Sequence, residues 1–192
     1  IYLSAIAPQS HAPHITAAAL WLNGTNDHHG GHERGEQTFR AFQPDIPWSF
    51  AHQPRGHHDT RDIGQNARLW LEKHVLGKDI DWPEEAGSKI VLDAQGVPEL
   101  HVSPADPDRV NHLEIYYALK NPVSYGRAWR NATLRRKGDV WIGKMPVLDV
   151  RDYVFGFSNI QYDNTVVCSS PFTATIPESL GDAIATDRRS LK

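Results

Sequence analysis

Ala17–Gly31, with the sequence AAALWLNGTNDHHGG, sets the interpretation of the first part of the chain. It opens with a run of apolar residues and changes abruptly to polar, turn-forming residues at Asn23. A short apolar run without alternation is typical of a strand buried on both faces of a parallel sheet. In open α/β sheets, ligands and catalytic groups gather beyond the carboxyl ends of such strands. Asp27 occupies that position, either as a turn residue or as a functional carboxylate.

Length and composition are those of an ordinary globular protein. The chain has 192 residues, 40% of them hydrophobic and 22% charged. A net charge of −3 gives no reason to expect nucleic acid as a partner, and no stretch has the length of a membrane span. Cys168 is the only cysteine, which excludes an intrachain disulfide. The chain begins without Met or a signal-like segment, so we expect a truncated or processed product and assign no compartment.

An alternation of strands and helices continues through residues 1–79. The pattern predicts a short helix over Glu33–Phe42 and a second strand at Trp48–Ala51. Ile63–Val75 carries apolar residues at i, i+4 and i+7, which predicts a longer helix. Strands that alternate with helices build a parallel sheet, so we expect an α/β fold in this part.

Gly56-His57-His58 follows the second predicted strand, as Asp27 follows the first. Both loops would then open at the same edge of a parallel sheet, where a carboxylate can orient an imidazole that acts as a base. His57 is the preferred partner of Asp27 because it directly follows glycine, and His58 is the alternative.

This part of the chain resembles the C-terminal third of an α/β-hydrolase of the dienelactone-hydrolase or prolyl-oligopeptidase-like esterase kind. The resemblance lies in residues 20–27, in Gly56-His57 and in the helix Ile63–Val75, and it implies that Asp27 is the triad acid and His57 the triad base. The family's Gly-x-Ser-x-Gly nucleophile motif and its oxyanion-hole segment are absent from this chain, which would therefore be inactive alone.

Residues 89–176 have a different pattern, with short strands separated by turns. Residues 113–119 and 153–157 alternate, and Lys137-Gly138-Asp139 indicates a hairpin. A phase change after Phe157 predicts a β-bulge near Ser158-Asn159. We expect an immunoglobulin-like β-sandwich here, joined by a linker over residues 80–88 and followed by a flexible tail over residues 177–192.

Three side-chain clusters have alternative interpretations. The first could bind a metal ion, but Gly30-Gly31 disfavours the helix that would align it, so no metal is expected; it comprises His28, His29 and His32. The second could form a glycan platform but is interpreted as sandwich core; it comprises Trp129, Trp141, Tyr116, Tyr125 and Tyr153. The third is basic and is interpreted as a solvated strand face; it comprises Arg127, Arg130, Arg135, Arg136 and Lys137.

The sequence thus predicts a partial α/β-hydrolase followed by an all-β domain. The implied reaction is hydrolysis of a small-molecule ester, with no cofactor, and no partner protein can be named. The alternative is a non-enzymatic protein that binds a glycan or another protein through the β-sandwich.

Overall fold

A computed structural model describes residues 6–186 of the chain. The chain divides into two compact units, Ile1–Asp81 and Trp82–Lys192, named unit 1 and unit 2 below. Within the described residues, none of the helices combines the length and the apolar character needed to cross a membrane.

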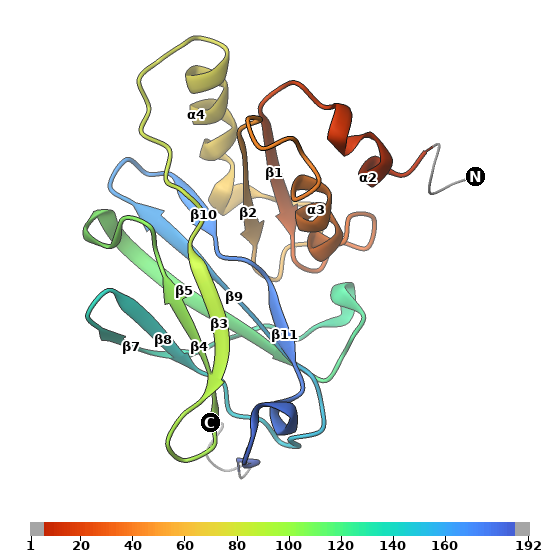
Figure 1. The fold of residues 1–192 in the computed structure, drawn as a ribbon, viewed down its shortest axis with the longest axis vertical. Coiled ribbons are helices and arrows are strands. Elements are labelled where there is room, and N and C mark those ends of the chain that lie inside the picture. The colour runs from red at the N-terminus through yellow and green to blue at the C-terminus, as the bar shows by residue number, and fades with distance from the viewer. Residues whose placement is uncertain (1–5, 187–192) are drawn as a thin grey trace. The chain divides into compact units, whose positions relative to one another are not determined.

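Unit 1 is built on one pair of parallel strands with short helices around it (Figure 1). In chain order its elements are α2 (Pro8–His11), η1 (Ala12–His14), β1 (Ala19–Gly24), α3 (His32–Phe39), β2 (Trp48–Gln53), η2 (Arg61–Ile63) and α4 (Gln65–His74), where η marks a 3₁₀ helix. Helix α3 packs against both strands and α4 packs against β1. The long helix predicted over Ile63–Val75 is therefore a 3₁₀ turn followed by an α-helix.

Helix α3 fits against the β pair through one aromatic contact. The Trp21 indole lies where a side chain at position 35 would be, so Gly35 allows the helix to approach the strand closely. One turn later, the Phe39 ring meets Trp21 edge to face, with ring centroids 5.9 Å apart. Burial of these rings holds the helix on the strands.

His52 is a fully buried histidine next to the last residue of β2. Its ring lies 5.2 Å from that of His32 on α3 and 5.3 Å from that of Phe50. Burial disfavours the charged imidazolium and lowers the pKa of His52 to about 3. His52 is therefore neutral in the folded protein at physiological pH.

Acid should destabilise unit 1 through His52. A histidine with a folded pKa below its unfolded value of 6.5 binds fewer protons when folded, so its stabilising effect is complete above 6.5 and is lost as the pH falls. Between roughly pH 7 and pH 5 we expect the free energy of unfolding to fall by about 2 kcal/mol on account of this residue. Denaturant titrations at the two pH values measure this fall in the free energy of unfolding. The fall should be smaller by about 2 kcal/mol in His52→Leu than in the natural chain. An equal drop in both proteins would contradict the prediction.

Unit 2 consists of two antiparallel sheets that pack face to face (Figure 1). The first sheet has the order β3-β4-β8-β7, and the second has the order β10-β9-β5-β6 with β11 also paired to β9. The strands are β3 (Gly87–Leu92), β4 (Pro98–Ser103), β5 (Val110–Leu119), β6 (Arg130–Asn131), β7 (Thr133–Lys137), β8 (Val140–Lys144), β9 (Val154–Tyr162), β10 (Val167–Ser169) and β11 (Thr173–Thr175). Short 3₁₀ turns are η3 (Pro107–Arg109), η4 (Ser124–Gly126) and η5 (Pro177–Leu180).

The core of unit 2 lies between the two sheets. Leu100 on β4 and Ile115 on β5 are fully buried, and Gly143 on β8 lies so close to Ile115 that a side chain there would displace it. An aromatic group on the second sheet adds to this core; it comprises Tyr116, Trp129, Phe155 and Phe157. Trp129 and Tyr116 are thus core residues, as the sequence predicts.

The predicted hairpin is strands β7 and β8. Gly138 stands in the turn with φ of 59°, a left-handed conformation that glycine adopts without strain. Within the described part of the chain, β7 pairs only with β8 and is the last strand of its sheet, and all five of its residues are exposed. The interpretation of the basic cluster as a solvated strand face is confirmed for Arg130, Arg135, Arg136 and Lys137. It is wrong for Arg127, which is buried with its guanidinium 3.8 Å from the centroid of the Phe155 ring.

The bulge predicted near Ser158-Asn159 is wrong. β9 pairs with β5 in unbroken register through Ile115 opposite Ser158 and Glu114 opposite Asn159, and the register shift lies instead at Val110 on β5. β9 lies between β5 on one side and β10 and β11 on the other, and its first five residues are all buried. The change of hydrophobic phase therefore reflects a strand covered on both faces at one end.

The predicted fold class, a partial α/β-hydrolase followed by an immunoglobulin-like sandwich, is wrong. Among the described residues, parallel pairing is confined to β1 and β2, and every other strand pair is antiparallel. The molecule is mostly β, with 34% strand and 21% helix, and is sandwich-like. An apolar run identifies a buried strand but does not determine how many strands pair with it. Here the apolar run forms β1, which belongs to a two-stranded sheet with β2.

The predicted linker and tail stay predictions. β3 begins at Gly87, inside the segment 80–88, and η5 lies inside the segment 177–192. The backbone N–H of Ile184 donates to the Gly96 carbonyl and that of Thr186 to the Val147 carbonyl. Residues 187–192 of the predicted tail lie outside the described residues.

Candidate functional sites

The parallel pairing of β1 and β2 brings the loops after the two strands together. The register ends with Gly24 opposite Gln53. Beyond it, Thr25 donates its backbone N–H to the Gln53 carbonyl at 3.0 Å, and Asn26 donates to the Gly56 carbonyl at 2.8 Å. A Cβ atom on residue 24 would collide with the Gly56 carbonyl, so only glycine permits this close approach. The two loops therefore form one continuous surface.

Asp27 is held from three directions on this surface. Its Oδ2 atom lies 3.0 Å from Nδ1 of His58, and its Oδ1 atom accepts the backbone N–H groups of His29 at 2.8 Å and Gly30 at 3.4 Å. Partial burial raises the pKa of Asp27, but these hydrogen bonds outweigh it, and the pKa is lower than usual. The ionised carboxylate therefore favours the tautomer of His58 that carries its proton on Nδ1.

The structure brings His58 to Asp27 and places His57 elsewhere. Nδ1 of His57 lies 2.9 Å from the backbone carbonyl of Asn26. Arg55 has a positive φ of 61° at the start of the turn, which turns the chain sharply before the two histidines. The preference for His57 over His58 as the partner of the carboxylate is thus not met by the geometry.

Three exposed imidazoles gather beside Asp27. The ring centroid of His58 lies 5.1 Å from that of His28 and 5.0 Å from that of His29, and the His28 and His29 centroids are 3.9 Å apart. One ring nitrogen from each lies within 4.8 Å of the others. His32, which the sequence grouped with the first two, is instead buried against His52.

Unit 2 carries an open groove between the edges of its two sheets. The groove has a volume of about 460 Å³ and is lined by residues 110–113 of β5, 134–136 of β7, and Trp141 of β8. The Arg136 guanidinium lies over the Trp141 ring, 4.1 Å from its centroid. A second hollow, of about 370 Å³, lies over β3, β4 and the start of β8, and its lining contains no tryptophan, tyrosine or phenylalanine.

The five aromatic residues grouped by the sequence are not all core residues. Tyr125 and Tyr153 are 55% and 45% exposed, and Trp141 is half-buried in the groove. Tyr153 stacks on Phe155, with centroids 5.7 Å apart. The interpretation as sandwich core is therefore wrong for these three, and Trp141 is the one that lines a concave surface.

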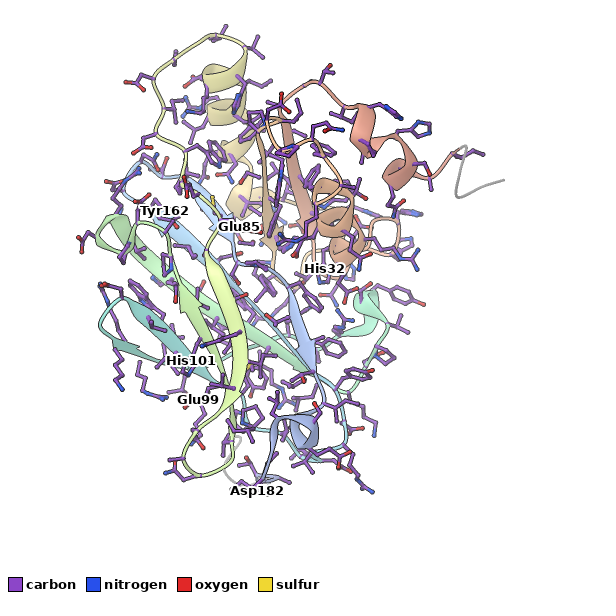
Figure 2. All side chains as sticks on the ribbon, in the orientation of Figure 1. His32, Glu85, Glu99, His101, Tyr162 and Asp182 are labelled. Atoms are coloured by element: carbon purple, nitrogen blue, oxygen red, sulfur yellow. The ribbon has the colours of Figure 1, made fainter. Side chains whose placement is uncertain are left out.

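A buried carboxylate lies behind the groove, because Glu99 and Arg135 share the face of the sheet opposite to Trp141. Glu99 on β4 is buried and accepts two hydrogen bonds from Arg135, at 2.5 and 2.7 Å. His101, its near neighbour on the same strand, places Nε2 3.3 Å from the second oxygen (Figure 2). The hydrogen bonds from Arg135 hold the pKa of Glu99 below its usual range despite burial. Arg135 is thus anchored to Glu99 on that face, whereas Arg136 lies on the same face as Trp141.

Comparisons with known proteins give a likeness to solved structures but no family. No family model matches the chain, and no curated protein matches it. Among solved structures, the crystal structure of a Br derivative of BhCBM56, a carbohydrate-binding module, is similar with a TM-score of 0.37 and 8% identity. The match covers 50% of this chain and 96% of that chain.

The predicted relationship to α/β-hydrolases is wrong. Over residues 6–186 the molecule is mostly β, and its only parallel pairing is that of β1 with β2, whereas the predicted hydrolase domain requires a larger parallel sheet. The predictions of hydrolase and esterase activity and of a catalytic triad are therefore also wrong. The small-molecule ester expected as substrate is not supported either. Asp27 and His58 remain a hydrogen-bonded pair with no established role.

Proposed function

We propose that unit 2 is a glycan-binding module and that the ligand lies in the groove between β5 and the β7–β8 hairpin. The observation that carries this proposal is the half-buried indole of Trp141 in a concave surface with hydrogen-bonding side chains around it. A sugar ring has apolar C–H faces and a rim of hydroxyl groups. It therefore suits a site that combines an aromatic surface with a few placed polar groups.

The polar side chains of the groove can both donate hydrogen bonds to a hydroxyl group and accept hydrogen bonds from it. Asn111 offers an amide donor and an amide acceptor, His112 offers one of each when neutral, and Arg136 offers only donors. The volume of about 460 Å³ lies within the range of about 300–1,000 Å³ that is usual for small-molecule sites. A short segment of an oligosaccharide is the ligand class that fits.

The groove is held in shape before binding. The Arg136 guanidinium lies over the Trp141 ring and donates from Nε to the Gly138 carbonyl at 2.8 Å. Side chains that are already ordered lose less conformational entropy when a ligand arrives. This order favours recognition by a rigid surface over recognition by a mobile loop.

Trp141→Ala should weaken binding of the recognised glycan by about tenfold or more, because the variant loses the aromatic surface and its stacking energy. The measurement is calorimetric titration of the full chain with soluble glucans, mannans, xylans and galactans, followed by titration of the variant with whichever polysaccharide binds. Tyr125→Ala is the matched control, since Tyr125 is an exposed aromatic residue outside the groove. We expect the control to bind like the natural chain.

Two results would overturn the proposal. The first is that none of the polysaccharides binds to the natural chain. The second is that Trp141→Ala binds as tightly as the natural chain while its circular dichroism and its unfolding transition are unchanged.

A further inference from the structure

We propose that His28, His29 and His58 form a binding site for a divalent transition-metal ion such as Zn²⁺, with Asp27 orienting His58 from the side away from the metal. The site lies wholly within unit 1 and is independent of the glycan groove of unit 2. The juxtaposition that carries the proposal is three imidazole nitrogens within 4.8 Å of one another.

Residues far apart in the sequence contribute to this site because of the parallel pairing. His28 and His29 follow β1, and His58 follows β2, thirty and twenty-nine positions further on. The backbone hydrogen bonds of Thr25 and Asn26 to the second loop hold the two loops together. The ligand set is therefore assembled by the fold and not by a local sequence motif.

The size of the cluster suits a tetrahedral ion after small side-chain rotations. Zinc–nitrogen bonds of about 2.0–2.1 Å place neighbouring ligand nitrogens about 3.3 Å apart. The three nitrogens must therefore approach by at most about 1.5 Å from a separation of up to 4.8 Å. All three side chains are exposed, so rotation about their χ angles meets little resistance from packing.

Asp27 has the position of a carboxylate that supports a metal-ligating histidine. Its Oδ2 atom lies 3.0 Å from Nδ1 of His58, which leaves Nε2 of that ring with its lone pair for the metal. The carboxylate is itself held by the backbone N–H groups of His29 and Gly30. A histidine with its far nitrogen hydrogen-bonded to an anchored carboxylate is the usual arrangement around bound zinc.

The donor set also indicates the class of metal. Three neutral imidazoles suit Zn²⁺, Cu²⁺, Ni²⁺ and Co²⁺, whereas Ca²⁺ and Mg²⁺ prefer oxygen ligands. Three protein ligands leave a fourth tetrahedral position for water or an anion. The site should accordingly bind Zn²⁺ in the presence of excess Mg²⁺.

The test is calorimetric titration of the tag-free full chain with Zn²⁺ alone. We expect one ion per chain, with affinity reduced at least tenfold in His29→Ala and in His58→Ala. Asp27→Asn should weaken binding by about 10–100-fold while keeping the three ligands. Zn²⁺ should also raise the unfolding temperature of the natural chain and leave that of His58→Ala unchanged.

Matched controls separate this site from ordinary surface histidines, of which the chain has several among its 11. His57→Ala removes the ring next in sequence to His58, and His14→Ala removes an exposed histidine of unit 1 that lies before β1. Both should bind Zn²⁺ like the natural chain. Equal affinity in His58→Ala, a loss in His57→Ala as large as in His58→Ala, or no Zn²⁺ binding by the natural chain would each overturn the proposal. His58→Gln, which keeps a polar side chain, repeats the test if His58→Ala fails to fold.

Discussion

Phe157→Ala should lower the free energy of unfolding of unit 2 by about 3–5 kcal/mol, the range for deleting a buried phenylalanine ring. Phe157 is 0% exposed and lies near the middle of β9. Its ring centroid is 5.3 Å from that of Tyr116 and 5.0 Å from that of Trp129. Truncation would leave a cavity lined by rings on a sheet that cannot collapse to fill it. Denaturant unfolding of the full chain, with the midpoint of the unit 2 transition as readout, measures the loss.

Two variants control for this result. Phe157→Leu keeps much of the buried volume and should lose clearly less stability than Phe157→Ala. Tyr153→Ala removes an aromatic ring that is 45% exposed and should shift the midpoint only slightly. A Phe157→Ala protein as stable as Tyr153→Ala would show that the aromatic group is not the centre of the core.

Gly24→Ala is expected to lower the free energy of unfolding of unit 1 by about 3 kcal/mol, the upper part of the range for overpacking. The added Cβ atom would meet the backbone carbonyl oxygens of Gly56 and His57, which cannot rotate away as a side chain can. The loops after β1 and β2 would have to separate, carrying His58 away from the other two imidazoles. We therefore also expect Zn²⁺ affinity to fall at least tenfold. Denaturant unfolding and calorimetric titration with Zn²⁺ measure the two effects.

Gly31→Ala is the matched control for Gly24→Ala. It lies in the same loop, but a Cβ atom there would only touch Arg34 at an ordinary distance of 3.9 Å. Its φ of −65° is one that alanine adopts freely. If Gly24→Ala unfolded at the same denaturant concentration as Gly31→Ala, the close approach of the two loops would be disproved.

Local elements could be predicted from the sequence better than their assembly. The apolar run before Asn23 does form a strand, and Lys137-Gly138-Asp139 does mark the hairpin between β7 and β8. These features depend on a few neighbouring residues and on the backbone freedom of glycine. The number of strands that pair with β1 depends on residues distant in the chain, and hydrophobic periodicity carries no information about it. The resemblance to a hydrolase implied a larger parallel sheet around β1, and that expectation is wrong.

The candidate sites show the same limit at the scale of single side chains. His57 and His58 are adjacent, and the backbone turn that begins at Arg55 determines which of them meets Asp27. His32 is buried under β2, although it lies only a few residues after His28 and His29. No spacing rule separates these cases, because the deciding contacts come from the second strand.

Trp129 and Trp141 illustrate why an aromatic pattern does not reveal a binding surface. Both lie in or beside short strands. Trp129 packs against Phe157 in the core, whereas Trp141 lies on β8, one strand from the edge of its sheet, and lines the groove. Position within the sheet makes the difference, and it follows only from the strand order.

The exposed outer strand β7 has one more consequence, for self-association. An unpaired strand edge is a template on which another copy of a protein can add a strand, which is how many β-rich proteins aggregate. Arg135 is paired with Glu99 on β4, but Arg136 and Lys137 add positive charge to the outer strand, so two copies approaching edge to edge would repel one another. The charges that flank the groove thereby also protect the sheet from intermolecular pairing.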